Sequence, residues 1–350
     1  MSELPIDILL EIFGYLSLWD LVNCELVCKL FKKIIRSNKW EHLIKGNAKP
    51  ELMEIFVKNH NFVNYDFGIN SILIDVKNIK NCKKIAIKNN GGLTDEDLKY
   101  FSNCKDVQIM NQEITDESLK YLENCRELKL SNCRHITGKG FVYLKNITIL
   151  YVNLCHKVTD ESLQYLSNCS ELNLNMCYKI TDEGLKHLSN CETLDLSNNN
   201  NITDEGLKYL KACRSLRICN CNNIKYKKME YFKNLHILII NGYYITDEDL
   251  KYLENCRELI IQDCRNITGE GFKYLKNIKK FYADDCYQII DEGLKYLSNC
   301  EEIDIINNYL ITDDGLKHLK ACKKIRLWNC GNITYKGIDH LSHCDIIDFE

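Results

Sequence analysis

Apolar and polar positions follow a short rhythm that recurs along most of this chain. In one typical segment, Leu172 and Leu174 alternate with polar neighbours, which is the pattern of a strand with one buried face. Thr181 follows where a helix N-cap is expected, with acidic residues next to it that suit the helix dipole. Leu185 and Leu188 then have the i, i+3 spacing of a short helix. The segment therefore predicts a strand, a turn, a short helix and a return.

This unit is repeated with a period of 21 or 22 residues. The twelve equivalent N-cap positions are Thr94, Thr115, Thr137, Thr159, Thr181, Thr203, Lys225, Thr246, Thr268, Ile290, Thr312 and Thr334. A single unit cannot bury its apolar face, so units of this length stack and share a core. We therefore predict an α/β fold, a leucine-rich-repeat solenoid shaped like a horseshoe, with about twelve strand–helix repeats over residues 72–350.

Residues 1–45 lack the repeat and show helical spacing instead. Ile8, Ile12 and Phe13, with Leu16, form an apolar stripe, and we expect a small all-α unit here. Residues 46–71 show no clear periodicity and are interpreted as a linker to the solenoid.

Most of the 20 cysteines recur at two phases of the repeat. Those before the strand are Cys104, Cys125, Cys169, Cys191, Cys213, Cys256, Cys300, Cys322 and Cys344, and those after it are Cys133, Cys155, Cys177, Cys221, Cys264, Cys286 and Cys330. Asn199 and Asn308 replace the second kind, which suggests a buried turn whose side chain bonds backbone. Only Cys24/Cys28 and Cys219/Cys221 are close, without a second ligand pair, so we expect no metal site. Reduced thiols favour a cytoplasmic or nuclear protein.

The net charge of the chain and the motifs it lacks argue against several classes of function. The net charge of -3 gives no nucleic-acid footprint, and no apolar run is long enough for a membrane span. Neither a nucleophile–base motif nor a phosphate-binding loop occurs, so we expect no catalytic residues and no cofactor, and an enzyme is the weakest hypothesis.

The N-terminal segment resembles an F-box. The matching residues, in the order of the family pattern, are Leu4-Pro5, Ile8-Leu9, Ile12-Phe13, Tyr15-Leu16, Asp20-Leu21, Val27-Cys28-Lys29, Phe31 and Trp40, with Phe31 where Trp is commoner. Followed by cysteine-containing repeats, this segment makes the chain similar to the F-box/leucine-rich-repeat family, found in eukaryotes and some large DNA viruses. Its heavy use of Asn, Lys, Ile and Tyr is typical of an A/T-rich genome.

The resemblance implies a non-catalytic substrate-recognition subunit of an SCF-type (Skp adaptor–cullin–F-box) ubiquitin ligase. By motif, the adaptor-binding residues would be Leu4, Pro5, Ile8, Leu9, Ile12, Phe13 and Leu16. Val27, Phe31 and Trp40 would contact either the adaptor or the unit's own core. A scaffold or competitor that binds the adaptor or another partner without promoting ubiquitination is the alternative.

The substrate protein would lie on the concave strand face, beside the buried leucines. Exposed aromatic and arginine side chains are the types that dominate binding energy, although any long array exposes some by chance. The candidates are Tyr151, Arg217, Tyr282, Arg326 and Trp328. Residues 114–128 return at 245–259 and residues 212–227 at 321–336, shifts that differ by one repeat. We therefore expect one composite site, weighted toward the C-terminal half, rather than two copies of a site.

Overall fold

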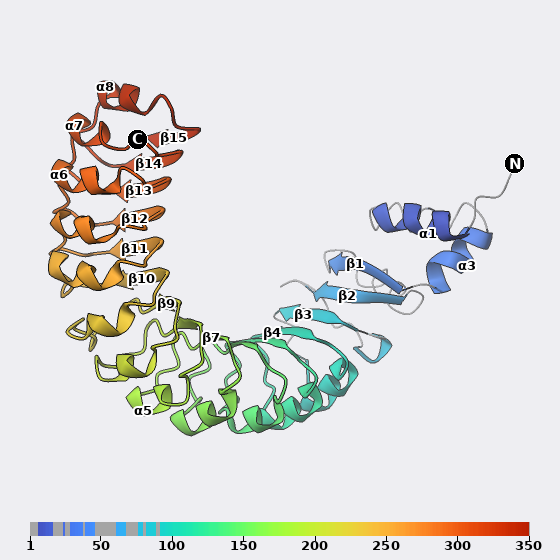
Figure 1. Cartoon of the computed structure of the whole chain (residues 1–350). Coiled ribbons are helices and arrows are strands. Elements are labelled where there is room, and N and C mark those ends of the chain that lie inside the picture. Colours follow the sequence, from blue (N-terminus) through green and yellow to red (C-terminus); the bar gives the residue numbers. More distant parts are fainter. Residues whose placement is uncertain are drawn as a thin grey trace, which may run out of the picture. The chain divides into compact units, whose positions relative to one another are not determined.

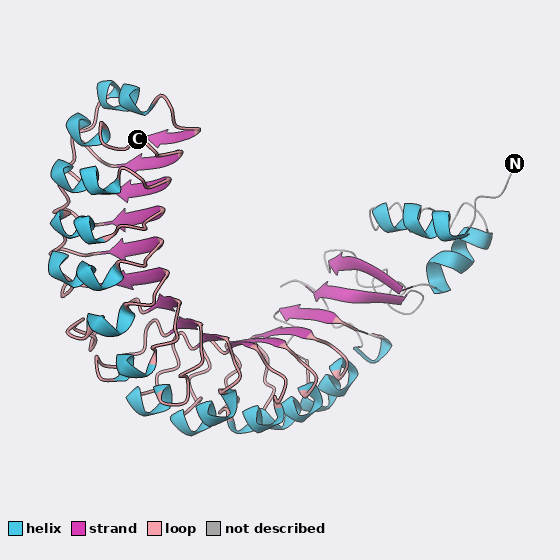
Figure 2. Ribbon diagram, viewed as in Figure 1, coloured by secondary structure: helices cyan, strands magenta, loops and turns pink. Residues whose placement is uncertain are grey.

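The computed structural model describes residues 6–16, 24, 29–37, 39–45, 61–67, 76–79, 82–88 and 92–349. The chain divides into two compact units, Met1–Lys157 and Val158–Glu350. In the repeat region of each unit the strands lie side by side on one face and the helical turns lie on the other (Figures 1 and 2). This is the leucine-rich-repeat solenoid predicted from the period.

The first unit begins with two α-helices and continues as a parallel sheet. The helices are α1 (Ile6–Tyr15) and α3 (Lys29–Ser37). The strands, in spatial and sequence order, are β1 (Lys39–Lys45), β2 (Asn61–Phe67), β3 (Lys84–Lys88), β4 (Asp106–Met110), β5 (Glu127–Ser131) and β6 (Ile149–Tyr151). Phe13 of α1 packs edge-on against Phe31 of α3, with ring centroids 5.1 Å apart. This contact holds the two helices together.

The second unit is a parallel sheet of nine strands among the described residues. They are β7 (Glu171–Asn173), β8 (Thr193–Asp195), β9 (Ser215–Arg217), β10 (Ile237–Asn241), β11 (Glu258–Gln262), β12 (Lys280–Asp284), β13 (Glu302–Ile306), β14 (Lys324–Trp328) and β15 (Ile346–Phe349). Equivalent residues of successive repeats are register partners, as Leu194 and Leu216 are. Residues one repeat apart therefore form straight rows across the sheet.

The helical segments of the repeats are short, and the longest have seven residues. The α-helical ones are α5 (Asp182–Leu185), α6 (Asp291–Leu294), α7 (Asp313–Leu316) and α8 (Tyr335–Ile338). The 3₁₀ turns are Val76–Asn78, Asp95–Phe101, Asp116–Leu122, Lys139–Tyr143, Asp160–Leu166, Gly206–Tyr209, Met229–Phe232, Asp247–Leu253, Glu270–Tyr274, Lys295–Leu297 and Asp339–Leu341. A 22-residue repeat that must advance by one strand spacing leaves room for no longer helix.

The sheet begins earlier than the sequence pattern indicated. Trp40, expected at the end of an all-α unit, lies in β1, and β2 falls within the segment interpreted as a linker. Val63, Tyr65 and Phe67 alternate with polar residues in β2, which is the same period-two signal as in the repeats. The domain boundaries themselves stay a prediction.

One aspartate in most repeats bonds the N-cap threonine of the next repeat. Asp182 accepts hydrogen bonds from the amide of Thr203, at 2.9 Å, and from its hydroxyl, at 2.6 Å. The same pairs are Asp95–Thr115, Asp116–Thr137, Asp160–Thr181, Asp247–Thr268, Asp291–Thr312 and Asp313–Thr334. From the sequence, these acidic residues were expected only to interact favourably with the dipole of the helix that they begin. Their carboxylates also join adjacent repeats.

Several repeats lack the aspartate of this contact. Tyr226 stands where the aspartate belongs, and in the next repeat Asp249 bonds Thr246 instead, its Oδ2 2.7 Å from the hydroxyl oxygen. Gly269 also replaces the aspartate, and there the following N-cap position is Ile290, which has no hydroxyl to satisfy. At a third place Gly138 replaces the aspartate while the following N-cap residue is still Thr159, so the two residues of the contact do not always change together.

The glycine of the repeat makes room for the same carboxylate. At Gly184 and Gly206 a Cβ atom would lie 2.3 and 2.4 Å from Oδ1 of Asp160 and Asp182. Gly315 and Gly337 have the same relation to the preceding repeat, at 2.3 and 2.2 Å. A side chain at these positions would displace the aspartate that links the repeats.

The buried thiols act as hydrogen-bond donors to backbone carbonyls. Sγ of Cys125 lies 2.9 Å from the oxygen of Glu127, and Sγ of Cys221 lies 3.2 Å from that of Leu196. Nδ2 of Asn199 bonds the carbonyls 25 and two residues before it, which are the same positions that Cys221 bonds. The predicted equivalence of Cys and Asn is confirmed at this turn. Asn308 bonds a different pair of carbonyls, those of Cys286 and Ile289.

We predict that replacing Asp182 by Ala destabilises the second unit by about 1–3 kcal/mol, because the amide and hydroxyl of Thr203 lose their acceptor. The shift of the urea midpoint measures this cost. Glu183→Ala is the matched control, since its exposed carboxylate bonds only Lys186, and should change stability by less than about 0.5 kcal/mol. Equal shifts for the two variants would show that the Asp–Thr contact carries no special weight.

We also predict that stability falls as pH rises from about 9 to about 12. Burial raises the pKa of Cys125, Cys213 and Cys256 from 9.0 to about 12. Unfolded thiols therefore lose their protons first, so the thiols' contribution is complete below pH 9 and lost as the pH approaches 12. Thiolate absorbance should rise near pH 9 in urea and only at higher pH in the folded protein; one titration midpoint for both states would contradict the burial argument.

Candidate functional site: two binding surfaces

Helix α1 presents an apolar face that the described residues leave uncovered. Ile8 and Ile12, one helical turn apart, are each 43% exposed, and Tyr15, at the next turn, is 86% exposed. Ile6 and, on α3, Leu30 are also exposed. Leu9 and Phe13 lie on the opposite face and are buried. An apolar helix face in water is a candidate for contact with a protein partner.

The predicted adaptor residues divide between this face and the interior. Of that set, Ile8 and Ile12 are exposed, and Leu16 and Phe31 are half-buried. Leu9 and Phe13 are buried, and Phe13 packs against Phe31 of α3. Leu4, Pro5 and Val27 lie outside the described residues, and Trp40 lies in β1. Ile6, Tyr15 and Leu30 were missed as site residues, although the i, i+4, i+7 spacing of Ile8, Ile12 and Tyr15 gives the signal for a shared face.

A second surface lies on the strand face of β11–β15. The outward residues form rows, and one row runs through Ile260, Tyr282, Asp304, Arg326 and Asp348. The next row runs through Gln262, Asp284, Ile306 and Trp328. Three of the five predicted substrate residues, Tyr282, Arg326 and Trp328, are therefore placed close together. Trp328 is 42% exposed.

The other two candidates lie elsewhere in the array. Arg217 is exposed on β9, where its Nε is 3.9 Å from Oδ2 of Asp195. Tyr151 is half-buried on β6 of the first unit, with the Lys129 ammonium 4.9 Å from its ring centroid. Neither β6 nor β9 belongs to the β11–β15 rows.

The electrostatics of the β11–β15 surface are dominated by partly buried acids. Burial raises the pKa of Asp304, although Nη1 of Arg326 lies 3.0 Å from its Oδ2. Burial also raises the pKa of Asp284, and the neighbouring acids add to the effect. Burial and a hydrogen bond with Glu302 raise the pKa of Tyr282. Carboxylates held partly out of water favour a positively charged neighbour.

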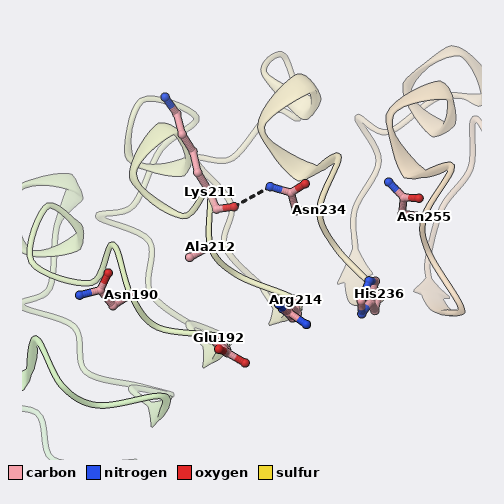
Figure 3. Close-up of a pocket in the computed structure, with 8 residues that line it drawn as sticks. All are labelled: Asn190, Glu192, Lys211, Ala212, Arg214, Asn234, His236 and Asn255. Carbon is pink, nitrogen blue, oxygen red and sulfur yellow. Dashed lines mark hydrogen bonds between the residues drawn. The ribbon is translucent and has the colours of Figure 1, made fainter.

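The second unit also has a polar groove of about 730 Å³ beside the starts of β8–β10 (Figure 3). Asn190 and Asn255 lie toward its two ends, and Nδ2 of Asn234 bonds the carbonyl of Lys211 at 2.9 Å. Ala212 stands in this asparagine row without an amide, which opens the groove. Its charged and titratable groups are those of Glu192, Lys211, Arg214 and His236.

Catalytic and metal chemistry find no support in the described part of the chain. The cysteines there are free, and burial keeps most of their pKa values above the ordinary range, which makes them poor nucleophiles. No group of three or more His, Cys, Asp or Glu side chains in the described ranges could hold a metal ion. None of the helices described is long and apolar enough to cross a membrane.

Comparison with known proteins agrees with the two-part reading of the sequence. The F-box-like family model matches residues 1–45, and a leucine-rich-repeat model matches residues 192–211. The E3 ubiquitin-protein ligase SGIP1 of Arabidopsis thaliana is 32% identical over 90 residues, which cover 25% of this chain and 28% of that protein. The match thus spans little more than a quarter of this relative's length.

Solved structures with the same fold include proteins of diverse origin. An internalin (inlF) from Listeria monocytogenes superposes with a TM-score of 0.57 at 20% identity, over 87% of this chain and 89% of that one. TLR13, solved with ssRNA13, gives 0.62 at 15% identity, over 89% and 49% of the two chains. The yeast complex of Rad7 and Elc1 gives 0.57 at 15% identity, over 95% and 88%. At these identities the likeness shows the fold alone.

The apolar stripe on α1, the parallel strand rows and the two family matches support one conclusion. The chain combines an F-box-like segment with a leucine-rich-repeat solenoid, as its resemblance to F-box/leucine-rich-repeat proteins implied.

Proposed function

We propose that this protein is the substrate-recognition subunit of an SCF-type ubiquitin ligase. The F-box-like segment would dock on a Skp-type adaptor and through it on a cullin and a RING subunit, and the strand face would hold a substrate protein. The observation that carries the proposal is the uncovered apolar face of Ile8, Ile12 and Tyr15 within the segment that matches the F-box-like model.

The structure of α1 supports separate roles for its two faces. Leu9 and Phe13 pack inward, and Phe13 contacts Phe31, so this face stabilises the helix pair. The opposite face buries nothing among the described residues, and covering Ile8, Ile12 and Tyr15 would remove a large apolar area from water. Two similar proteins agree with this role: one is named as an E3 ubiquitin-protein ligase, and Rad7 was solved as a complex with Elc1.

The protein itself would form and break no covalent bond. Binding a substrate and a ligase core at the same time raises the effective concentration of substrate lysines near the charged conjugating enzyme. Rows of variable outward side chains on a rigid sheet suit the substrate half of this task. Buried, protonated thiols fit a reducing compartment, the cytoplasm or the nucleus.

A second function uses the same two surfaces. A scaffold or competitor would occupy the adaptor, or sequester a partner, without recruiting the cullin. The α1 face favours adaptor binding in both cases, and only the presence of cullin in the complex separates them.

We predict that Ile8→Asp/Ile12→Asp abolishes co-purification of adaptor and cullin from a eukaryotic lysate, because two buried charges would oppose docking. Both side chains are exposed in the free protein, so the variant should melt within a few degrees of the wild type. Val142→Asp in the repeats, exposed to a similar extent at 41%, is the matched control and should retain both partners.

The outcomes separate the two functions. Loss of adaptor and cullin in the α1 variant, with retention in the control, supports the ligase receptor. Capture of adaptor without cullin by the wild type favours the competitor. A folded wild type that captures neither protein would refute the ligase receptor and the adaptor competitor, and would leave only a scaffold that sequesters another partner.

A further inference from the structure

The strand face of β10 and β11 carries an apolar patch at positions where a half-covered sheet has polar residues. Ile237 and Ile239 of β10 and Ile260 of β11 lie between buried neighbours and are themselves half-buried. Strand β10 reads Ile-Leu-Ile-Ile before its last residue, which is a continuous apolar run. Such runs are typical of strands that are covered on both faces. The patch therefore has the composition of a surface that a partner covers.

The earlier block of repeats shows that the fold does not require these isoleucines. Residues 245–259 repeat residues 114–128, and by the same shift Gln108 on β4 and Lys129 on β5 are the equivalents of Ile239 and Ile260. The buried positions beside them are apolar in both blocks. The change to isoleucine thus concerns the outward positions, where it serves a contact at the surface and not the core.

The patch is part of a straight row that crosses four neighbouring strands (Figure 1). Arg217 of β9, Ile239 of β10, Ile260 of β11 and Tyr282 of β12 are successive register partners. Tyr282 is half-buried and extends the apolar surface with its ring. The row therefore presents a cation at one end and three apolar side chains in succession.

The guanidinium of Arg217 is open to a further partner. The side chain is 49% exposed, and its Nε lies 3.9 Å from Oδ2 of Asp195, which is too far for a hydrogen bond. Both oxygens of Asp195 already accept hydrogen bonds, Oδ1 from the amide of Ser197 at 2.9 Å and Oδ2 from Nδ2 of Asn173 at 3.1 Å. Among the described residues the Arg217 guanidinium donates no hydrogen bond. A carboxylate from a partner can therefore bind it through two N–H groups.

The spacing of the row favours one shape of partner. Neighbouring strands of a sheet lie about 4.8 Å apart. An α-helix advances about 5.4 Å per turn, so a helix that crosses the strands places one side chain of each turn on one strand. Side chains on the same face of an extended chain are about 6.8 Å apart, and they lose this match within two strands.

From these features we infer that the β9–β12 face binds an amphipathic helix of the substrate protein. Apolar side chains at i, i+4 and i+7 of the helix pack on Tyr282, Ile260 and Ile239, and an acidic side chain at i+11 binds Arg217. Covering the patch removes apolar area from water, and the ion pair sets the direction of the helix. This direction also places the negative end of the helix dipole near Arg217. The inference rests on the proposed function and names the chemistry of the substrate.

The test uses the full-length protein and a fluorescent alanine-rich helical peptide with leucines at i, i+4 and i+7 and a glutamate at i+11, measured by anisotropy. We expect saturable binding that falls at least about tenfold when the same leucines are distributed around the helix. Ile239→Gln/Ile260→Lys should weaken binding by about tenfold or more. This variant should melt within a few degrees of the wild type, because Gln108 and Lys129 hold the equivalent positions in the earlier block. Leu310→Lys, which replaces an exposed apolar residue outside the row, is the matched control and should leave binding unchanged.

The ion pair is tested by a double-mutant cycle between Arg217 and the glutamate of the peptide. Glutamine in place of that glutamate should weaken binding to the wild type several-fold and should have no effect on binding to Arg217→Gln. Because the Arg217 side chain is exposed, the variant should keep the stability of the wild type.

The inference is overturned if the peptide with distributed leucines binds as well as the original, or if Ile239→Gln/Ile260→Lys binds like the wild type. It is also overturned if Leu310→Lys weakens binding as much as that variant does, if the glutamine peptide loses equally on the wild type and on Arg217→Gln, or if the original peptide fails to bind at concentrations on the order of 1 mM. Adaptor capture is measured separately. Peptide binding without adaptor capture by the wild type would remove the proposed function alone, and adaptor capture without peptide binding would remove this inference alone.

Discussion

The bond from one aspartate to the threonine of the next repeat is the contact on which the regularity of the solenoid depends. A repeat of 22 residues leaves the N-terminal amides of its short helical turn without intrahelical partners. The preceding repeat supplies the acceptor, as Asp182 does for Thr203. Most turns are capped by their neighbour in this way, which favours a constant offset between adjacent repeats. The strand rows that carry the proposed binding residues inherit that constancy.

In the interior, too, polar groups of the repeats satisfy one another's hydrogen bonds. Each repeat bends its backbone sharply after the strand, and the carbonyls left there need donors in a place that excludes water. A thiol or a carboxamide at one position reaches the same two carbonyls, as Cys221 and Asn199 do. Burial in turn holds the thiols protonated, which keeps them donors and removes them from redox and metal chemistry. The described cysteines therefore contribute to the architecture of the repeats, as donors to backbone carbonyls.

The sequence predicted the fold well because its information is periodic. Spacing alone predicts the solenoid, its strands and the outward rows, because the same pattern of apolar and polar residues recurs in every repeat. Single events were harder to predict: β2 lacks the 22-residue echo, although Val63, Tyr65 and Phe67 alternate as a strand should. The role of the aspartates was predicted only in part. The helix-dipole argument considers a single repeat, whereas the hydrogen bond joins the aspartate to the threonine of the next repeat. Which face of α1 packs inward depends on contacts with α3, so Leu9 and Phe13 could not be separated from Ile8 and Ile12 by spacing alone.

Duplication of a block of repeats explains why core and surface obey different rules. The Asp–Arg pair survives in both places, at Asp195–Arg217 and at Asp304–Arg326, and the buried leucine and isoleucine rows around it are interchangeable. The difference between the two places arises from strand length: three residues in β8 and five in β13. Two additional residues in the ladder strengthen the sheet and withdraw the amide that would otherwise satisfy the aspartate. A local gain in backbone pairing thus leaves one carboxylate oxygen of Asp304 without a hydrogen-bond partner among the described residues, while the register between the repeats is kept.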